Sequence, residues 1–310
     1  MAMHTELTTN TAHGQQPAHG VPLPIAMREA VARIKGLPTL PAIAQRIMQV
    51  AADPLADAAK LAETIELDPL LTAQIIRWAG SPLYAYRGKI VSVKDAIIRV
   101  LGFDFVLNAA LSLAALKPLQ ISRDGALGSQ ALWLQALASA RLMQLLNNRQ
   151  PVDQKLPGQE IFAAALIHNI GFQLLGHAFH EEYDYLNKIV STNVSLSVVS
   201  IEQFALDVDH GLLGAWLMRT WAMPKPLIDV VYHHHNPYYR GDNYRLNLIT
   251  FVNDCLLGEL GLGDAQHVDC PDEVYTDLQL AKTDCLNALD AISAQLDSIK
   301  QTAELLTAAV

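Results

Sequence analysis

Residues 53–80 have the sequence DPLADAAKLAETIELDPLLTAQIIRWAG, and this stretch decides the fold class. Each of its two Asp-Pro pairs can end one helix and begin the next, because Asp accepts hydrogen bonds from free N–H groups at a helix start and Pro fits the first turn. Asp57 is a further candidate cap, and Leu61 and Ile65 then lie one helical turn apart on a single face. Gly80 is typical of a helix end. The stretch therefore predicts two short helices separated by a tight turn.

The same pattern extends to both sides of this stretch. Pro41 suits a first helical position, and residues 42–52 carry apolar side chains on one face. On the other side, Ser92 and Asp95 resemble the two ends of a capping box in which Asp replaces the usual Glu or Gln. No run alternates between polar and apolar residues for long enough to require a β-strand. The chain is therefore predicted to be all-α.

Composition and turn signals divide the chain into four segments. Residues 1–24 are polar and almost without charge, which predicts a disordered tail. A turn-forming connection after residue 117 separates two helical lobes, which we place at 25–120 and 121–262. Residues 263–310 form the last segment and contain a predicted C-terminal helix.

The composition excludes several classes of function. Apolar residues make up 51% of the chain, and 22 Lys and Arg against 31 Asp and Glu give a net charge of −9. The few, scattered basic residues argue against binding to nucleic acid or to an anionic membrane, since both require clustered positive charge. The most apolar run, 105–116, is shorter than the about 20 residues that span a bilayer. Three cysteines without paired spacing are typical of a reduced, cytoplasmic protein.

The last segment carries apolar residues whose spacing alternates between 4 and 3, as in the seam of a coiled coil. This seam consists of Cys285, Leu289, Ile292, Leu296, Ile299, Ala303 and Leu306. Most flanking positions are uncharged, so charge does not specify a partner. Two interpretations stay open: the helix packs on its own domain, or it pairs with a second copy to form a homodimer.

Histidines are concentrated in the second lobe and are its main chemical feature. His168 lies on the apolar face of one predicted helix, His210 belongs to a later one, and His234 and His235 lie near the end of a third. Imidazoles that point inward from three helices could bind a transition-metal ion. Hydrolytic metal centres usually need carboxylates as well, yet the residue after His168 is Asn169.

Several motifs together resemble the HDOD domain family, whose members are bacterial signalling modules related to the HD and HD-GYP metal-dependent phosphohydrolases. In chain order the motifs are Leu37–Pro41, Asp53-Pro54, Asp68-Pro69, Leu71–Arg77, Ser81–Tyr84, Ala96–Gly102, Leu132-Trp133, Ala165–Gly171, Asp209-His210, Trp221–Pro224 and His234–Pro237. They cover roughly residues 25–262, and their shared order and spacing argue against chance similarity. The resemblance implies an HD-like second lobe and a regulatory role.

The resemblance also assigns the positions that bind metal in the catalytic relatives. In this chain they are Gln135, His168, Asn169, His210, His234, His235 and Asn253. Asn stands at two positions where the relatives have Asp, although Asp254 lies one residue beyond the second. An Asn side chain is a neutral, weaker ligand and cannot bridge two metal ions as a carboxylate does. The resemblance therefore predicts a degenerate site without catalysis or a cofactor.

Alternatives for this pocket stay open. The histidines could be neutral and hydrogen-bonded inside an inherited pocket, or they could bind a single Zn or Ni ion without catalysis. A metal-dependent phosphohydrolase acting on cyclic dinucleotides or nucleotides is the enzymatic alternative, and a ligand sensor is another. No phosphate loop, dinucleotide fingerprint or nucleophile elbow indicates a different enzyme class.

Two clusters in predicted connections are candidates for a partner surface, because Tyr and Arg are frequent at binding hot spots. They are Tyr84, Tyr86 and Arg87, and Tyr238, Tyr239 and Arg240. We expect the partners to be other signalling proteins.

Overall fold

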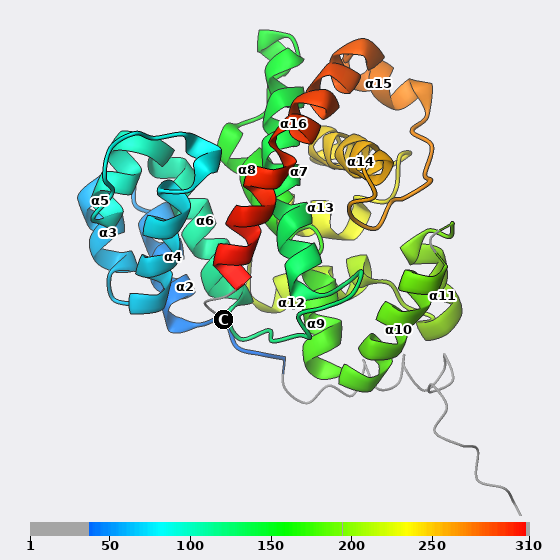
Figure 1. The fold of residues 1–310 in the computed structure, drawn as a ribbon, viewed down its shortest axis with the longest axis horizontal. Coiled ribbons are helices and arrows are strands. Elements are labelled where there is room, and N and C mark those ends of the chain that lie inside the picture. Colours follow the sequence, from blue (N-terminus) through cyan, green and yellow to red (C-terminus); the bar gives the residue numbers. More distant parts are fainter. Residues whose placement is uncertain (1–36, 194, 308–310) are drawn as a thin grey trace, which may run out of the picture.

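The computed structural model describes residues 37–193 and 195–307. These residues form helices joined by turns and short connections, with no β-strand among them (Figure 1). The all-α prediction is confirmed. The polar tail predicted for residues 1–24 lies outside the described residues.

The first lobe is coloured blue to cyan in Figure 1 and precedes the connection at residue 117. Its elements are α2 (Ala42–Ala51), α3 (Ala58–Ile65), α4 (Pro69–Ala79), the 3-10 turn η1 (Pro82–Tyr84), α5 (Val93–Ala96), the π-helical turn η2 (Ile97–Leu101) and α6 (Phe103–Leu116).

The starts of three of these helices are capped as the sequence predicts. Asp57 accepts hydrogen bonds from two backbone N–H groups of α3 at 2.9 and 3.0 Å. Asp68 does the same for α4 at 3.1 and 3.2 Å, with Pro69 in the first turn. The hydroxyl of Ser92 accepts from the backbone N–H of Asp95 at 3.0 Å. Local sequence therefore fixes where α3, α4 and α5 begin.

The second lobe follows the connection and carries the histidines. Its elements are α7 (Ser129–Arg149), η3 (Val152–Gln154), α8 (Gly158–Ile167), α9 (Ile170–Ala178), α10 (His180–Thr192), α11 (Val198–Leu206), α12 (His210–Thr220), α13 (Lys225–His233) and α14 (Tyr244–Glu259). The long helix α7 packs against both α8 and α14, so it forms the centre of this lobe.

Two helices follow the second lobe, and the second of them contacts both lobes. They are α15 (Asp272–Leu278) and α16 (Lys282–Thr307). α16 lies along α7 of the second lobe and also contacts α4 and η1 of the first lobe (Figure 1). The lobes meet directly as well, where α6 packs against α8.

The predicted seam of α16 is buried within the chain. Cys285, Leu289, Ile292, Ile299 and Ala303 are buried and Leu296 is half-buried, while the side chain of Leu306 lies outside the described part. These side chains cannot also pair with a second copy unless α16 leaves its place. The packing therefore agrees with a helix that belongs to its own chain and not with a homodimer built on this seam.

One apolar stretch was not singled out by the sequence analysis. Residues 158–178 are long and apolar enough to cross a membrane, but 83% of that window is buried inside the fold. Such burial is typical of the core helix of a globular domain. The stretch comprises α8 and α9, which flank His168 and Asn169.

Candidate functional site

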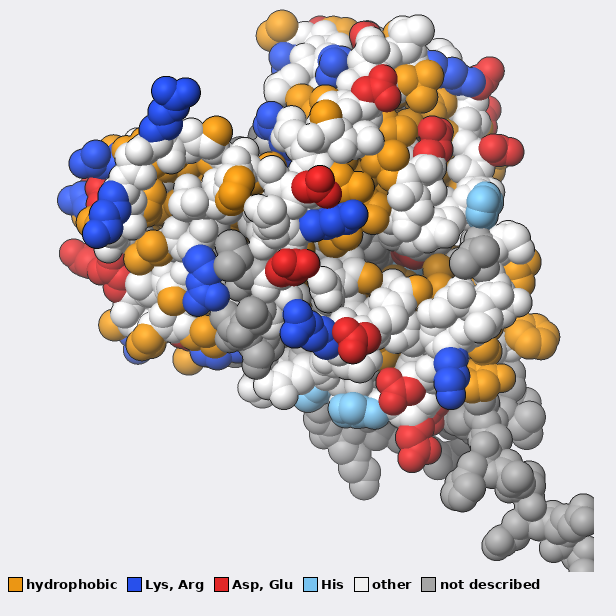
Figure 2. Space-filling view, viewed as in Figure 1, with side chains coloured by type: hydrophobic (Ala, Val, Ile, Leu, Met, Phe, Trp, Pro, Cys, Tyr) orange, Lys and Arg blue, Asp and Glu red, His pale blue; other side chains and the backbone are white. Residues whose placement is uncertain are grey.

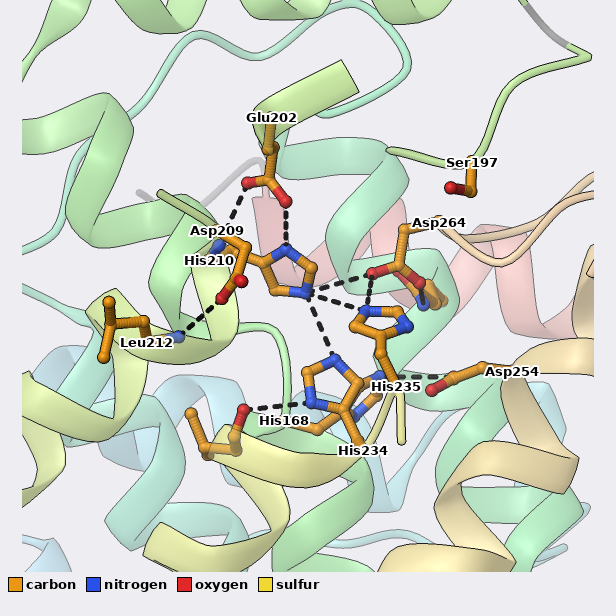
Figure 3. Close-up of polar contacts among 12 residues, drawn as sticks. His168, Ser197, Glu202, Asp209, His210, Leu212, His234, His235, Asp254 and Asp264 are labelled. Atoms are coloured by element: carbon orange, nitrogen blue, oxygen red, sulfur yellow. Dashed lines mark hydrogen bonds and ion pairs between the residues drawn. The ribbon is translucent and has the colours of Figure 1, made fainter. Parts of the chain in front are cut away.

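The four histidines singled out in the sequence lie together at the ends of three helices (Figure 3). His168 follows the last turn of α8, His210 begins α12, and His234 and His235 follow α13. Ring centroids of neighbouring members are 4.0 to 5.3 Å apart. The packing of distant helix ends thus builds the cluster.

A glycine allows two of these helices to approach. A Cβ atom on Gly171, in the first turn of α9, would lie 1.8 Å from the backbone oxygen of His210. Only a residue without a side chain fits at this separation. Gly171 therefore sets the position of His210 against α9.

Each of the three buried histidines is oriented by a hydrogen bond at Nδ1. His168 donates to the carbonyl of Ala165 at 3.0 Å, and His234 donates to the carbonyl of Val231 at 3.0 Å. A carbonyl can only accept, so the proton of both rings sits on Nδ1. Their Nε2 atoms are then the ones that can bind a ligand, an arrangement typical of metal-binding histidines.

The carboxylate of Glu202 orients the third ring and was missed by the sequence analysis. Its Oε2 lies 2.7 Å from Nδ1 of His210, and its Oε1 accepts from the backbone N–H of His210 at 3.1 Å. Glu202 comes from α11 and is fully buried. The signal available in the sequence was a single acidic residue in a mostly apolar stretch, eight residues before a histidine.

Asp264 is the second functional residue that the sequence analysis missed. It lies in the connection after α14, and its Oδ2 is 3.2 Å from Nε2 of His210 and 3.1 Å from Nε2 of His235 (Figure 3). Gln135 donates to its other oxygen at 3.3 Å. Gly263 precedes it with φ of +81°, a conformation that favours glycine. Glu202 and Asp264 therefore bring two carboxylates into the pocket from segments outside the predicted positions.

The remaining predicted positions form a second, adjacent half of the site. Nε2 of His168 lies 3.4 Å from Oδ1 of Asp254, so Asp254 faces the histidine in the place expected for Asn253. The amide of Asn253 instead donates to Ser139 at 2.9 Å and to Asp254 at 3.0 Å. Asn169 is buried beside His168.

Buried polar atoms without a hydrogen-bond partner gather in this half. Within the described part of the chain they include Nε2 of His168, both amide atoms of Asn169, Oδ1 of Asn253 and Oδ2 of Asp254. Such atoms normally bind water or an ion when they are buried. These atoms therefore suit a bound water molecule or ion in the second half of the site.

Neighbouring charges shift the pKa values in the first half of the site, which contains Glu202, His210, His234, His235 and Asp264. Burial disfavours the charged form of His210, but Glu202 and Asp264 outweigh it and raise its pKa to about 10. Burial raises the pKa of Glu202, which His210 offsets only in part. Burial would also raise the pKa of Asp264, yet the neighbouring His235 and His210 hold it well below its ordinary value. Burial and the adjacent histidines hold the pKa of His234 well below its usual range.

Four donor atoms in this half could hold one metal ion. They belong to His210, His234, His235 and Asp264, and no two lie more than 4.8 Å apart. Nε2 of His210 is 3.1 Å from Nε2 of both His234 and His235. Zinc bonds of about 2.0–2.1 Å in a tetrahedron require ligand separations of about 3.3 Å. Four of the six donor separations are 3.1–3.2 Å, close to this value, and all six are within 4.8 Å, so these groups suit one transition-metal ion.

A known protein family matches most of the length of this chain. A family model described as the HDOD domain matches residues 37–237, which include both the first lobe and the four histidines. The chain belongs to the HDOD domain family. Asp264 lies beyond the matched residues, so the carboxylate of the four-ligand set comes from outside the family segment.

Solved structures of similar proteins share this fold. A protein from Marinobacter aquaeolei VT8, whose name assigns it provisionally to signal transduction, has a solved structure with a TM-score of 0.79 and 29% identity, covering 94% of this chain and 68% of that one. An HDOD domain protein of unknown function from Geobacter sulfurreducens gives 0.72 and 22% identity, covering 91% and 97%.

A relative from Treponema pallidum (strain Nichols) is named only as uncharacterized. It is 25% identical over 224 residues, which are 71% of this chain and 42% of that protein. This chain thus spans less than half of that relative's length.

Only some of the residues predicted to form a partner surface of this HDOD domain are exposed in the structure. Tyr84 packs edge-on against Phe105 with ring centroids 5.8 Å apart, and burial raises its pKa. Tyr239 stacks on His233 with centroids 3.9 Å apart. Tyr238 is the exposed aromatic of the set, with 66% of its surface accessible. Tyr84 and Tyr239 therefore stabilise the fold, and Tyr238 remains available for contact.

The other three members of that set lie at the surface to different degrees. Tyr86 is half-buried, whereas Arg87 and Arg240 are exposed. Arg240 is held by Asp277 at 2.6 Å, so its guanidinium is already paired.

Proposed function

We propose that this HDOD domain is a non-catalytic signal-transduction module that acts by binding other proteins, and that its histidine cluster holds one structural metal ion. The observation that carries the proposal is the closed, four-ligand arrangement of His210, His234, His235 and Asp264. Structural zinc sites use four protein ligands, whereas catalytic sites keep one position open for water or substrate.

Burial of the ligands supports a structural role. The side chains of His210 and His234 are fully buried, Asp264 is 1% exposed, and His235 is 23% exposed. A phosphorylated substrate would have to reach the metal past His235, which is itself a ligand. Direct attack on a nucleotide at this centre would require the cluster to open.

The second half of the site lacks what a dinuclear hydrolase uses. Two divalent ions need a bridging carboxylate and several negative ligands to offset their charge. His168 and Asp254 supply one imidazole and one carboxylate, but Asn169 is neutral. One metal ion per chain is the occupancy that these side chains support.

Metal content and turnover test the proposal together. We expect the purified full chain to contain one zinc or nickel ion, which His234→Ala loses and His180→Ala, at an exposed helix start, retains. No phosphate should be released from cyclic dinucleotides or nucleotides with Mn, Fe or Ni added. Mass spectrometry of the metal and a phosphate assay measure both. Two ions per chain with turnover that His168→Ala abolishes would overturn the non-catalytic assignment, and a chain that binds none of these metals would overturn the structural metal.

Three large apolar side chains near α11 are exposed on the second lobe, where they could contact a partner protein. Phe204 of α11 is 86% exposed, and Leu196 and Leu212 nearby in the chain are 52% and 48% exposed. Figure 2 shows hydrophobic side chains at the surface on the side of the molecule where α10 and α11 lie. Large exposed apolar side chains of this kind are typical of interaction sites. We refer to these three residues as the α11 patch.

Removing the aromatic ring of the α11 patch should weaken partner binding without unfolding the chain. Phe204→Ser should reduce the amount of its main partner captured from the native organism at least fivefold, and it should change the free energy of unfolding by less than about 0.5 kcal/mol because the ring is exposed. Leu55→Ser, at an equally exposed site on the first lobe, is the control. Quantitative mass spectrometry of the captured proteins gives the result, and equal capture by both variants would contradict a role for the patch.

A further inference from the structure

A cavity of about 420 Å³ lies at the junction of the two lobes, separate from the histidine cluster. Its walls come from α4 and α6 of the first lobe, from the connection after α6, from α7 and α9 of the second lobe, and from the end of α16. A volume of this size lies in the range of small-molecule sites. Any ligand held here would contact both lobes at once.

The charge of the cavity wall is opposite to that of the chain. The chain has a net charge of −9, yet the residues that line the cavity include Lys117 and Arg123 and no Asp or Glu. Lys117 is paired with Asp68 at 2.7 Å. Within the described part of the chain, no acidic side chain pairs with Arg123. An exposed, unpaired guanidinium at a cavity mouth favours an anion.

A side-chain amide also lines the cavity. Gln74 of α4 is 6% exposed and belongs to the cavity wall, and its amide is not one of the buried polar groups that lack a partner among the described residues. Gln74 can both donate and accept, which suits the polar edge of a planar heterocycle.

An aromatic ring and apolar side chains complete the wall. Trp133 of α7 is half-buried and lines the cavity together with Leu113 and Leu116 of α6. The face of an indole ring can stack on a flat base, and such stacking tolerates different bases. The cavity therefore offers an indole ring, a side-chain amide and the guanidinium of Arg123 within one volume.

We infer that this junction cavity binds a nucleoside phosphate, with the base between Trp133 and Gln74 and the phosphate at Arg123 and Lys117. The site is distinct from the histidine cluster and goes beyond the proposed function, because it supplies an input signal. The ligand would bridge α4 of the first lobe and α7 of the second. Its binding would thereby stabilise one arrangement of the lobes relative to others.

Calorimetry on the full chain separates the two parts of the ligand. We expect AMP or GMP to bind at one site per chain and to raise the melting temperature, since a ligand that binds only the folded state stabilises it. Adenosine alone and inorganic phosphate alone should each bind at least tenfold more weakly. Phosphate binding as tightly as AMP would show a simple anion site and would overturn the nucleotide assignment.

Single substitutions in the cavity wall test whether the nucleotide binds there. Arg123→Gln should weaken AMP binding at least tenfold while leaving adenosine binding nearly unchanged, and Gln74→Leu should weaken both. Arg149→Gln is the matched control, because Arg149 is a surface cation of α7 that contacts Asp284 and does not line the cavity. Arg123 is exposed, so its variant should fold like the parent chain. Absence of binding by either nucleotide at millimolar concentration, or affinity unchanged in both variants, would overturn the inference.

Discussion

Replacing Asp264 by Ala is expected to lower the free energy of unfolding by about 3–5 kcal/mol and to abolish metal binding. Asp264 is buried, and its carboxylate contacts His210 and His235 at 3.1–3.2 Å. In the metal-free chain, the positive charge on His210 would lose one of its two carboxylate partners in a buried site. In the metal-bound chain, where His210 is a neutral ligand, the ion would lose its only anionic ligand in the four-ligand set.

A second substitution at Asp264 separates the effect of the carboxylate's charge from the effect of its size. Asp264→Asn keeps the size of the side chain but removes its charge, so we expect metal affinity to fall by at least about 100-fold with a smaller loss of stability than in Asp264→Ala. Asp242→Ala is the control, because that carboxylate is 80% exposed and solvent screens its contact with Lys225, so its loss should leave the stability nearly unchanged. Denaturant unfolding and competition with a chelator measure the two effects. Wild-type stability and metal content in Asp264→Ala would show that the carboxylate has no role in the centre.

The second large effect is expected at Gly171. Gly171→Ala should lower the free energy of unfolding by at least about 3 kcal/mol, at the upper end of the cost of overpacking. The added Cβ would lie 1.8 Å from the backbone oxygen of His210, and a backbone atom cannot move aside as a flexible side chain can. α9 and α12 would have to separate, which would also displace His210 from the cluster.

A matched glycine tests this explanation. Gly158 lies in the first turn of α8, and a Cβ atom there would meet nothing within 4 Å. Gly158→Ala should therefore raise the free energy of unfolding slightly, by less than about 1 kcal/mol, because alanine restricts the unfolded chain. Thermal and denaturant unfolding of both variants give the comparison. Equal stabilities for the two variants would show that α9 and α12 are not held at van der Waals contact.

The helices of the first lobe could be predicted because their signals are local. Asp57 and Asp68 accept bonds from N–H groups two and three residues away, and Ser92 accepts from a group three residues away. Such contacts depend on neighbouring residues alone. The spacing of apolar residues in α16 is also a local signal, and it predicted a helix. It left open whether the seam packs on its own domain or on a second copy of the chain.

The site was predicted in part. The resemblance to HDOD domains identified four histidines that the fold does bring together, and it placed Gln135 near them. It did not identify Glu202 or Asp264, since neither occupies a motif position. The resemblance placed Asn253 at the position of the last metal-binding Asp of the catalytic relatives. In the structure, α14 places the neighbouring Asp254 toward His168 instead.

The sequence alone determined the all-α class, the helix starts and the family, because capping and periodicity act over a few residues and motifs are written in order along the chain. The tertiary structure alone decided which groups meet. Asp264 contacts a histidine 29 residues earlier, and α16 buries its seam against helices of both lobes. The junction cavity exists only where the two lobes and α16 come together. Contacts between distant segments depend on how whole helices pack, and no local pattern encodes that packing.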